Sequence, residues 1–230
     1  MTHLQLSGTH DSCAYLSDES ALLARLFAPF CVCQSKTIAE QLAAGVRAFD
    51  IRCKIYKGEV WCYHGIARFN RLQTVLAELA CFLKTNHSII LIGFGREDRG
   101  ALLLKYSDQQ LWDAIVLTAY SVGLSLQPLD DNQQQIDGCY VTGFYRMKID
   151  FGLNYKGTGV SVKNYGCSAS GVLESVNRLL EYSWSDNLNF IYTNSPGGLI
   201  PMPKRWAKLF NATAVKYVAG RPCIWYRDFV

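Results

Sequence analysis

The chain has 230 residues, of which 50% are hydrophobic and 18% are charged, and its formal net charge is +4. This length and apolar content fit one well-packed domain over residues 1–230 better than two small ones. The modest charge, without clustered Lys and Arg, argues against nucleic-acid binding, and no apolar run approaches the about 20 residues that cross a bilayer.

Short apolar runs alternate along the chain with longer segments of helical periodicity, a pattern typical of a parallel sheet with crossover helices. The predicted strands are 4–8, 47–54, 59–65, 88–94, 138–144, 159–165, 189–194 and 223–229. The predicted helices are 37–45, 70–85, 108–123, 170–184 and 203–217, with Asn70, Ser170 and Pro203 as start signals. We therefore expect an α/β fold, an irregular (βα)8 TIM barrel, because the second and third strands leave no room for a helix between them.

Nine cysteines are present, and four of them fall in predicted strands: Cys53, Cys62, Cys139 and Cys223. Cysteine in a strand usually acts as a small buried apolar residue, so a reducing compartment is expected. Cys31 and Cys33 form a lone C-x-C without a second pair at zinc-like spacing. We predict no metal there.

Ionisable side chains gather at the carboxyl ends of the predicted strands, where barrel enzymes carry their chemistry. The ionisable residues are His10, Asp11, Asp50, Arg52, His64, Arg96, Glu97, Tyr165 and Asp228, and the amide of Asn164 lies beside them. Because these ends meet at one face of a barrel, we expect a common pocket.

The residue types in this pocket suit phosphodiester cleavage. Two histidines with carboxylate partners can supply a general base and a general acid. The planar fork of Arg52 can donate two parallel hydrogen bonds to phosphate oxygens. A metal is less favoured, because a cation beside Arg52 would be repelled by the guanidinium.

Three linked motifs, "SGTHDS", "QLAAGVRAFDIR" and "VWCYHG", resemble the catalytic X domain of phosphatidylinositol-specific phospholipases C. The resemblance is nearest to the bacterial, metal-independent enzymes and covers nearly the whole chain. It implies a phosphodiesterase of the phospholipase C type that needs no cofactor and cleaves an inositol phospholipid to diacylglycerol and an inositol cyclic phosphate. Arg52 and Gly95 stand where the calcium-dependent relatives carry acidic ligands, which disfavours calcium.

The resemblance also implies a role for each site residue. His10 would be the general base, supported by Asp228; His64 would be the general acid, assisted by Asp11. Arg52 would stabilise charge on the phosphate, and Asp50 would organise the network. The headgroup contacts would be Arg96, Asn164, Tyr165 and Arg146.

The apolar segment 21–33 has two interpretations. Leu22, Leu26 and Phe27 could pack in the core, or they could contact a membrane surface as a short interfacial helix does in the resembling family. Two other functions stay open: a barrel that binds inositol phosphates or lipid headgroups without cleaving them, and a metal-dependent glycerophosphodiesterase or sphingomyelinase. We see no export signal and expect a cytoplasmic or peripheral membrane protein, or a secreted effector that uses another route.

Overall fold

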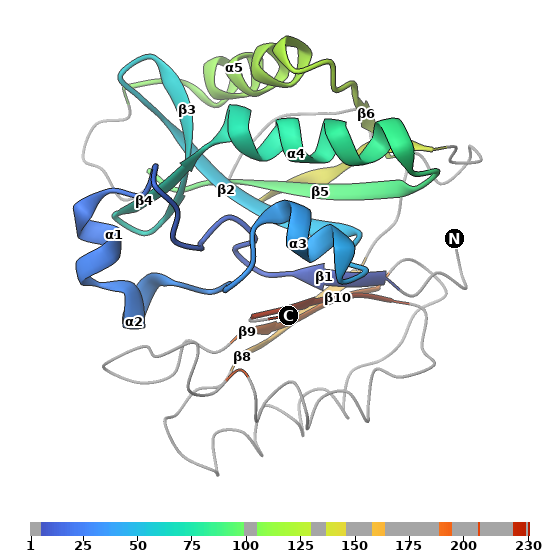
Figure 1. Ribbon diagram of the computed structural model, residues 1–230, viewed down its shortest axis with the longest axis horizontal. Coiled ribbons are helices and arrows are strands. Elements are labelled where there is room, and N and C mark those ends of the chain that lie inside the picture. The colour runs from blue at the N-terminus through green and yellow to red at the C-terminus, as the bar shows by residue number, and fades with distance from the viewer. Residues whose placement is uncertain are drawn as a thin grey trace.

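The computed structural model describes residues 6–98, 105–129, 137–145, 158–163, 189–194, 207, 223–228 and 230. Its centre is a sheet in which eight parallel strands follow the order β6-β7-β5-β2-β1-β10-β9-β8 (Figure 1). Their bounds are β1 Leu6–Thr9, β2 Ala48–Tyr56, β5 Ile89–Arg96, β6 Leu126–Pro128, β7 Gly138–Tyr145, β8 Thr158–Lys163, β9 Asn189–Asn194 and β10 Cys223–Arg227. The predicted α/β class is confirmed.

The strand predicted over 59–65 is real, but its place as a parallel barrel strand is wrong. β3 (Glu59–His64) runs antiparallel to β2 and pairs on its other side with β4 (Ala67–Arg71). The two-residue turn between β2 and β3 holds Lys57 at φ 51° and Gly58 at φ 84°. Two consecutive residues with positive φ characterise the tight hairpin turn, which joins antiparallel strands only. The remaining parallel strand is β6, which the sequence patterns did not reveal.

The described helices are α1 Leu22–Leu26, α2 Ala28–Cys31, α3 Ile38–Ala43, α4 Leu72–Thr85 and α5 Asp108–Ser121. The helices predicted over 37–45, 70–85 and 108–123 are confirmed. Thr37 and Ser107 form capping boxes at the starts of α3 and α5. Asn70 is not a cap: it lies in β4, and its amide donates to the carbonyl oxygens of Cys13 and Tyr15.

The predicted helices over 170–184 and 203–217, with their start signals Ser170 and Pro203, lie outside the described residues except for Ala207. Within the described part of the chain, no helix is both long and apolar enough to span a membrane.

Among the described residues, the largest hydrophobic core lies between the sheet and the helices α3, α4 and α5. Its buried members include Phe49, Ile51, Leu76, Ile92 and Leu111. Cys53, Cys62, Cys139 and Cys223 are buried, as predicted. The other face of the sheet carries a smaller apolar cluster that includes Ala48, Leu91 and Tyr226, and Asp50 and Arg52 follow Ala48 on that face of β2.

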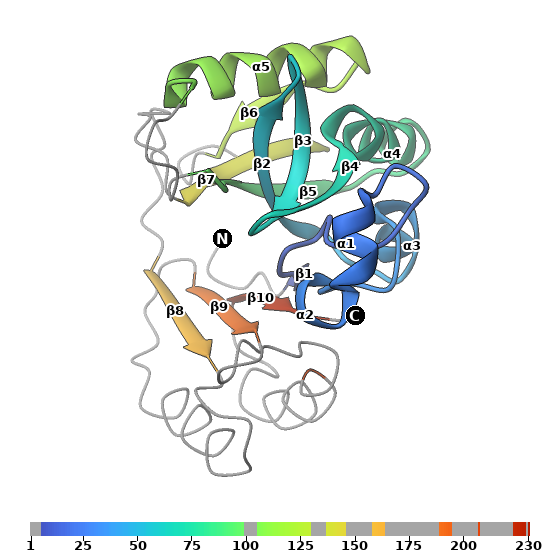
Figure 2. The same cartoon turned by 90° about the vertical axis from the view of Figure 1, so that its left-hand side faces the viewer.

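The sheet curves, so that β8, β9 and β10 lie across from β5 and β7 (Figure 2). Among the described strands, pairing runs without a break from β6 to β8, and no pairing joins these two ends. β1 lies near the middle of this path, between β2 and β10. Its carboxyl end therefore faces residues from both neighbouring strands.

Candidate active site

The turn that follows β1 is fixed by a set of buried hydrogen bonds. Ser12 accepts a hydrogen bond from the backbone N–H of Asp50 at 2.8 Å and donates to the carbonyl of Thr9 at 2.7 Å. The hydroxyl of Thr9 donates to Gln41 at 2.7 Å. Asp11 itself sits at φ 44°, in the left-handed region that Asp tolerates better than most residues. The turn thus tightly couples the carboxyl end of β1 to β2.

Close packing of β1 against its two neighbouring strands requires glycine at position 8. A Cβ atom on Gly8 would lie 2.9 Å from the ring of Tyr226 on β10 and 3.3 Å from Ala48 on β2. Only glycine therefore lets β1 pack between its two neighbours at this point. The close packing brings the carboxyl ends of β1, β2 and β10 together.

β2 supplies Asp50 and Arg52, which point to the same face because side chains alternate along a strand. Arg52 pairs with Gly95 on β5, and a Cβ atom there would lie 3.0 Å from Cγ of Arg52. Gly95 thus leaves room for the arginine side chain. The sequence analysis compared Gly95 with an acidic calcium ligand of the resembling family, and the structure gives a steric reason for glycine at this position.

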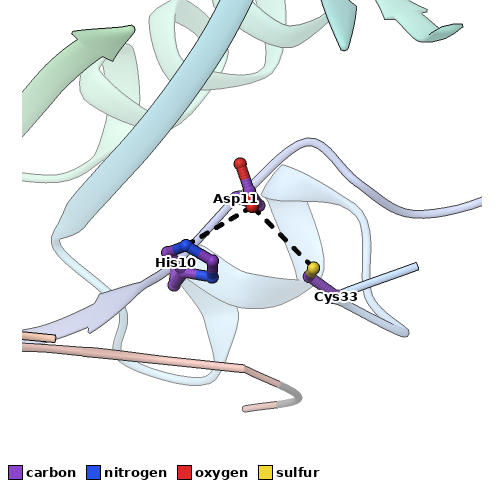
Figure 3. A group of neighbouring side chains, drawn as sticks. All are labelled: His10, Asp11 and Cys33. Atoms are coloured by element: carbon purple, nitrogen blue, oxygen red, sulfur yellow. Dashed lines mark hydrogen bonds and ion pairs between the residues drawn. The ribbon is translucent and has the colours of Figure 1, made fainter. Parts of the chain in front are cut away.

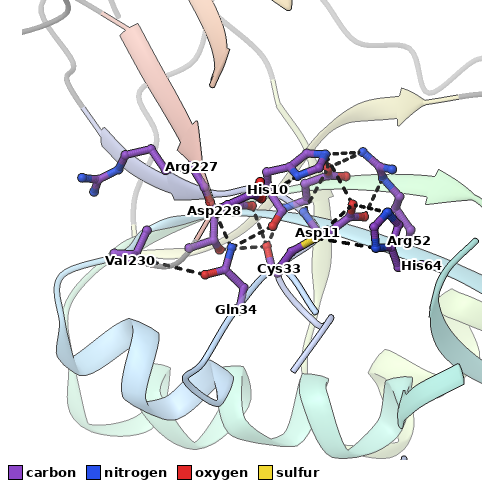
Figure 4. A network of polar contacts seen from close by, with 12 residues as sticks. His10, Asp11, Cys33, Gln34, Arg52, His64, Arg227, Asp228 and Val230 are labelled. Atoms are coloured by element: carbon purple, nitrogen blue, oxygen red, sulfur yellow. Dashed lines mark hydrogen bonds and ion pairs between the residues drawn. The ribbon is translucent and has the colours of Figure 1, made fainter. Parts of the chain in front are cut away.

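The guanidinium of Arg52 is the centre of the site (Figure 4). Its Nε lies 2.8 Å from Asp11 Oδ1, and its Nη2 lies 3.1 Å from Asp50 Oδ2 and 2.7 Å from His10 Nε2. Its Nη1 lies 3.4 Å from Glu97 Oε1. Three carboxylates therefore hold one planar cation at the end of the sheet.

His10 and Asp228 form a buried pair contributed by opposite ends of the chain. Nδ1 of His10 lies 2.8 Å from Asp228 Oδ1. Since an ionised carboxylate only accepts hydrogen bonds, Nδ1 carries the proton and Nε2 of the neutral ring keeps its lone pair. Burial alone lowers the pKa of His10, but the negative charges of Asp11 and Asp228 outweigh this effect and raise the pKa above its usual value.

His64, the second histidine, lies at the end of β3 and is more accessible to solvent. Its side chain is 26% exposed, against 6% for His10. Nδ1 lies 2.9 Å from the carbonyl oxygen of Cys31, so this nitrogen donates, and Nε2 lies 3.5 Å from Asp11 Oδ2. Asp11 is therefore flanked by both imidazoles and by Arg52.

The pKa values of Asp11 and Glu97 are shifted in opposite directions. Burial raises the pKa of Asp11, but Arg52, His64 and His10 lower it more, so its net shift is downward and it stays ionised. Burial and the charge of Asp11 raise the pKa of Glu97 despite its contact with Arg52. The site therefore holds a permanent carboxylate beside His64 and a second carboxyl group that is protonated more easily.

A metal ion has one conceivable set of ligands among the described residues, namely His10, Asp11 and Cys33 (Figure 3). Their ligand atoms lie within 4.8 Å of one another. The guanidinium of Arg52 already contacts two of these side chains, His10 and Asp11. Burial raises the pKa of the Cys33 thiol well above its usual value, as do Asp228 and Asp11, so no thiolate is ready for a metal. These features do not favour a cation at this place.

Sequence reasoning missed two residues that join the site from the segment after α2. The side-chain amide of Gln34 donates to the carbonyl oxygens of His10 at 2.8 Å and Arg227 at 2.9 Å, which ties β1 to β10. Cys33 contacts both Asp11 Oδ2, at 3.9 Å, and His64 Nδ1, at 3.6 Å. Gln34 has no sequence signal, since it lies in an irregular segment, and Cys33 stood out only as part of the lone C-x-C. Glu97 was recognised at a strand end but was given no role.

The structure brings together the six predicted catalytic positions: His10, Asp11, Asp50, Arg52, His64 and Asp228. Arg96 does not join them, and its prediction as a headgroup contact is corrected. Because it is adjacent to Gly95 on β5, Arg96 points to the opposite face. There it is buried and bonded to Asp98 and Asp108. Asn164, Tyr165 and Arg146 lie outside the described residues.

The apolar segment after the His10 turn is largely exposed. The exposed fraction is 70% for Leu22, 66% for Leu26 and 48% for Phe27, whereas Ala24 between them is buried. Core packing, the first of the two interpretations, therefore does not account for these three side chains.

The structure is similar to bacterial phosphatidylinositol-specific phospholipases C. The Staphylococcus aureus enzyme aligns with a TM-score of 0.72 and 15% identity over 100% of this chain and 87% of that one. The Listeria monocytogenes enzyme aligns with a TM-score of 0.69 and 22% identity over 99% and 89% of the respective chains. The sequence matches no protein-family profile and none of the curated proteins. The likeness shows the fold, and the predicted irregular TM barrel of the phospholipase C type is confirmed.

Proposed function

We propose that this chain is a phosphodiesterase that cleaves an inositol phospholipid to diacylglycerol and an inositol cyclic phosphate. The observation that carries the proposal is the pair of histidines on either side of Asp11, with a guanidinium held beside them. The fold agrees with it, since the similar structures are named phosphatidylinositol-specific phospholipases C.

His10 is the general base of the first step. Its Nε2 takes the proton of the inositol 2-hydroxyl while that oxygen attacks the phosphorus, and Asp228 stabilises the imidazolium that forms. In the free protein Arg52 donates to this same Nε2 at 2.7 Å. A phosphate that binds the guanidinium competes for this N–H and frees the nitrogen for the hydroxyl. Substrate binding and activation of the base are thereby linked.

His64 is the general acid. Nδ1 donates to the carbonyl of Cys31, which leaves Nε2 to deliver a proton to the glycerol oxygen as the phosphorus–oxygen bond breaks. Asp11 lies 3.5 Å from this nitrogen and stays ionised, so it can accept a hydrogen bond from this N–H and orient the ring. The larger exposure of His64 fits a leaving group that departs toward the lipid.

Arg52 stabilises the charge that develops on the phosphate oxygens. Its position is set before substrate arrives, because Asp11, Asp50 and Glu97 hold three of its edges. Preorganised donors of this kind need no rearrangement during the reaction. The attacking hydroxyl belongs to the same molecule as the phosphorus, so no external nucleophile has to be captured.

The exposed side chains Leu22, Leu26 and Phe27 would contact the lipid surface. α1 contacts β4, the strand that follows His64 and its turn, so this apolar segment lies near the general acid. That turn carries Ile66, which is 77% exposed. A short apolar segment beside the site would help the enzyme reach a phospholipid in a bilayer.

The proposal is tested with vesicles that contain labelled phosphatidylinositol, incubated with the protein with and without excess EDTA. The expected water-soluble product is inositol cyclic phosphate, formed equally in both samples because the phosphate charge is met by Arg52. Release of phosphoinositol without a cyclic form, or restoration by calcium after loss in EDTA, would contradict the mechanism. Binding of inositol phosphates without turnover would favour the non-catalytic alternative.

A further inference from the structure

The β2–β3 hairpin extends beyond the active site and has two different faces. Cys53, Ile55, Val60 and Cys62 belong to the core under the helices or pack against it. Lys54, Tyr56, Trp61 and Tyr63 alternate with them and point to the opposite face. That face is the continuation of the one that carries Asp50 and Arg52.

Cations gather on this face and stack on its aromatic rings. The guanidinium of Arg68, on β4, lies 4.6 Å from the ring centre of Tyr56 and 4.3 Å from that of Trp61. Nζ of Lys54 lies 3.9 Å from the ring centre of Tyr63. Strong contacts of this kind occur about once per 70–80 residues, so their concentration on one hairpin is unusual. We call Lys54, Trp61 and Arg68 the hairpin site.

The cations of the hairpin site lack ion-pair partners. No carboxylate of the described residues lies within 4.0 Å of Lys54 or Arg68. Glu97 and Asp98 act on Lys54 only from beyond that distance. By contrast, Arg71 on the same strand as Arg68 is paired with Glu19 and Glu59. Two positive charges therefore remain available to an anion.

Buried hydrogen-bond donors at the same place also lack acceptors. Trp61 is 6% exposed, and its indole N–H has no partner among the side chains and backbone that the structure describes. The same holds for Nε of Arg68. A buried donor without an acceptor is unfavourable, so such groups in a stable protein point to a ligand that supplies one. An anion with several acceptor oxygens would satisfy the N–H groups and both charges.

We propose that the hairpin site binds a second phosphate group of the substrate, so that the enzyme acts on inositol phospholipids whose ring is phosphorylated. This inference rests on the proposed function. Lys54 lies two residues beyond Arg52 on the same face of β2, a separation of about 7 Å along a strand. Tyr63, under Lys54, precedes His64 and pairs with Arg68. A headgroup whose scissile phosphate is at Arg52 therefore has a second phosphate site within reach, and Arg68 offers the fork that fits one.

The first experiment measures binding without turnover. Calorimetric titration with inositol trisphosphate compares the wild type with Lys54→Gln, Arg68→Gln and Trp61→Phe. The last of these keeps an aromatic ring but removes the indole N–H. Each variant is expected to bind about tenfold more weakly, since one charge-assisted hydrogen bond to phosphate is lost. Inositol monophosphate should bind equally to all of them. Lys84→Gln, at the end of α4, removes an exposed charge and should change nothing.

The second experiment measures cleavage of phosphatidylinositol and of phosphatidylinositol bisphosphate in otherwise identical vesicles. The wild type should favour the bisphosphate, and Lys54→Gln and Arg68→Gln should lose that preference while their rate on phosphatidylinositol is kept. If Lys54→Gln and Arg68→Gln lose as much binding to vesicles of phosphatidylglycerol as to vesicles with the bisphosphate, the site senses the charge of neighbouring lipids and the proposal is wrong. Equal trisphosphate binding by all variants also overturns it. If the variants bind trisphosphate more weakly but the wild type cleaves neither lipid, the hairpin site is upheld and the proposed enzymatic function is refuted.

Discussion

Arg52→Lys keeps the positive charge of the site but removes the planar fork. In the structure the guanidinium spans four groups, with Asp11, His10 and Asp50 within 3.1 Å and Glu97 at 3.4 Å. A lysine ammonium offers its donors from a single nitrogen, so it cannot reach both Asp11 on one side and Glu97 on the other. The network must therefore lose contacts even though its net charge is unchanged.

The expected loss in rate follows from the donors withdrawn from the phosphate. Removal of one preorganised donor to a developing oxyanion costs about 2.7–4 kcal/mol, or about 10²–10³ in kcat. We expect Arg52→Lys to lower kcat/KM on phosphatidylinositol by this factor, with a smaller change in KM. The buried carboxylates that lose a donor should also destabilise the fold by about 1–3 kcal/mol.

The assay follows release of inositol cyclic phosphate from vesicles, and thermal unfolding by circular dichroism reports stability. Arg47→Lys is the matched control. Arg47 lies immediately before β2 and donates to the carbonyls of Leu42 and Val46, so its replacement tests loss of an arginine fork outside the site. A folded Arg52→Lys enzyme with kcat/KM within about threefold of wild type would refute the assignment of a bidentate phosphate contact to Arg52.

Three further outcomes are expected. His10→Ala and His64→Ala should each abolish formation of the cyclic product in a folded protein, and near-normal turnover of either would remove the acid–base assignment. The base must be neutral to work and the pKa of His10 is raised, so the acidic limb of the kcat/KM profile should lie above the usual histidine pKa of about 6.5. Asp228→Asn removes a negative charge that raises this pKa, so it should shift the limb to lower pH as well as slow the reaction. A limb that does not move would belong to another group. Leu26→Ser combined with Phe27→Ser should weaken vesicle binding more than cleavage of a soluble inositol phosphodiester, and equal loss of both would show that the segment supports the fold instead.

The local part of the site follows from sequence alone. Strand alternation places Asp50 and Arg52 on one face of β2, and the start of the polar turn after β1 places His10 and Asp11 at its rim. The rule that barrel chemistry gathers at the carboxyl ends of strands then joins these pairs. The same alternation places Arg96 opposite to Gly95, so its exclusion from the site was also readable from the register of β5.

The tertiary structure decided what depends on contacts between distant segments. Asp228 meets His10 only because β10 pairs with β1, and Cys33 and Gln34 reach the site from an irregular segment without periodicity. The exposure of Leu22, Leu26 and Phe27 and the unpaired donors of the hairpin site are likewise invisible in sequence. Hydrophobic periodicity reports which face of an element is buried. Which partner covers that face, and which polar group is left without one, is set by packing between elements far apart in the chain.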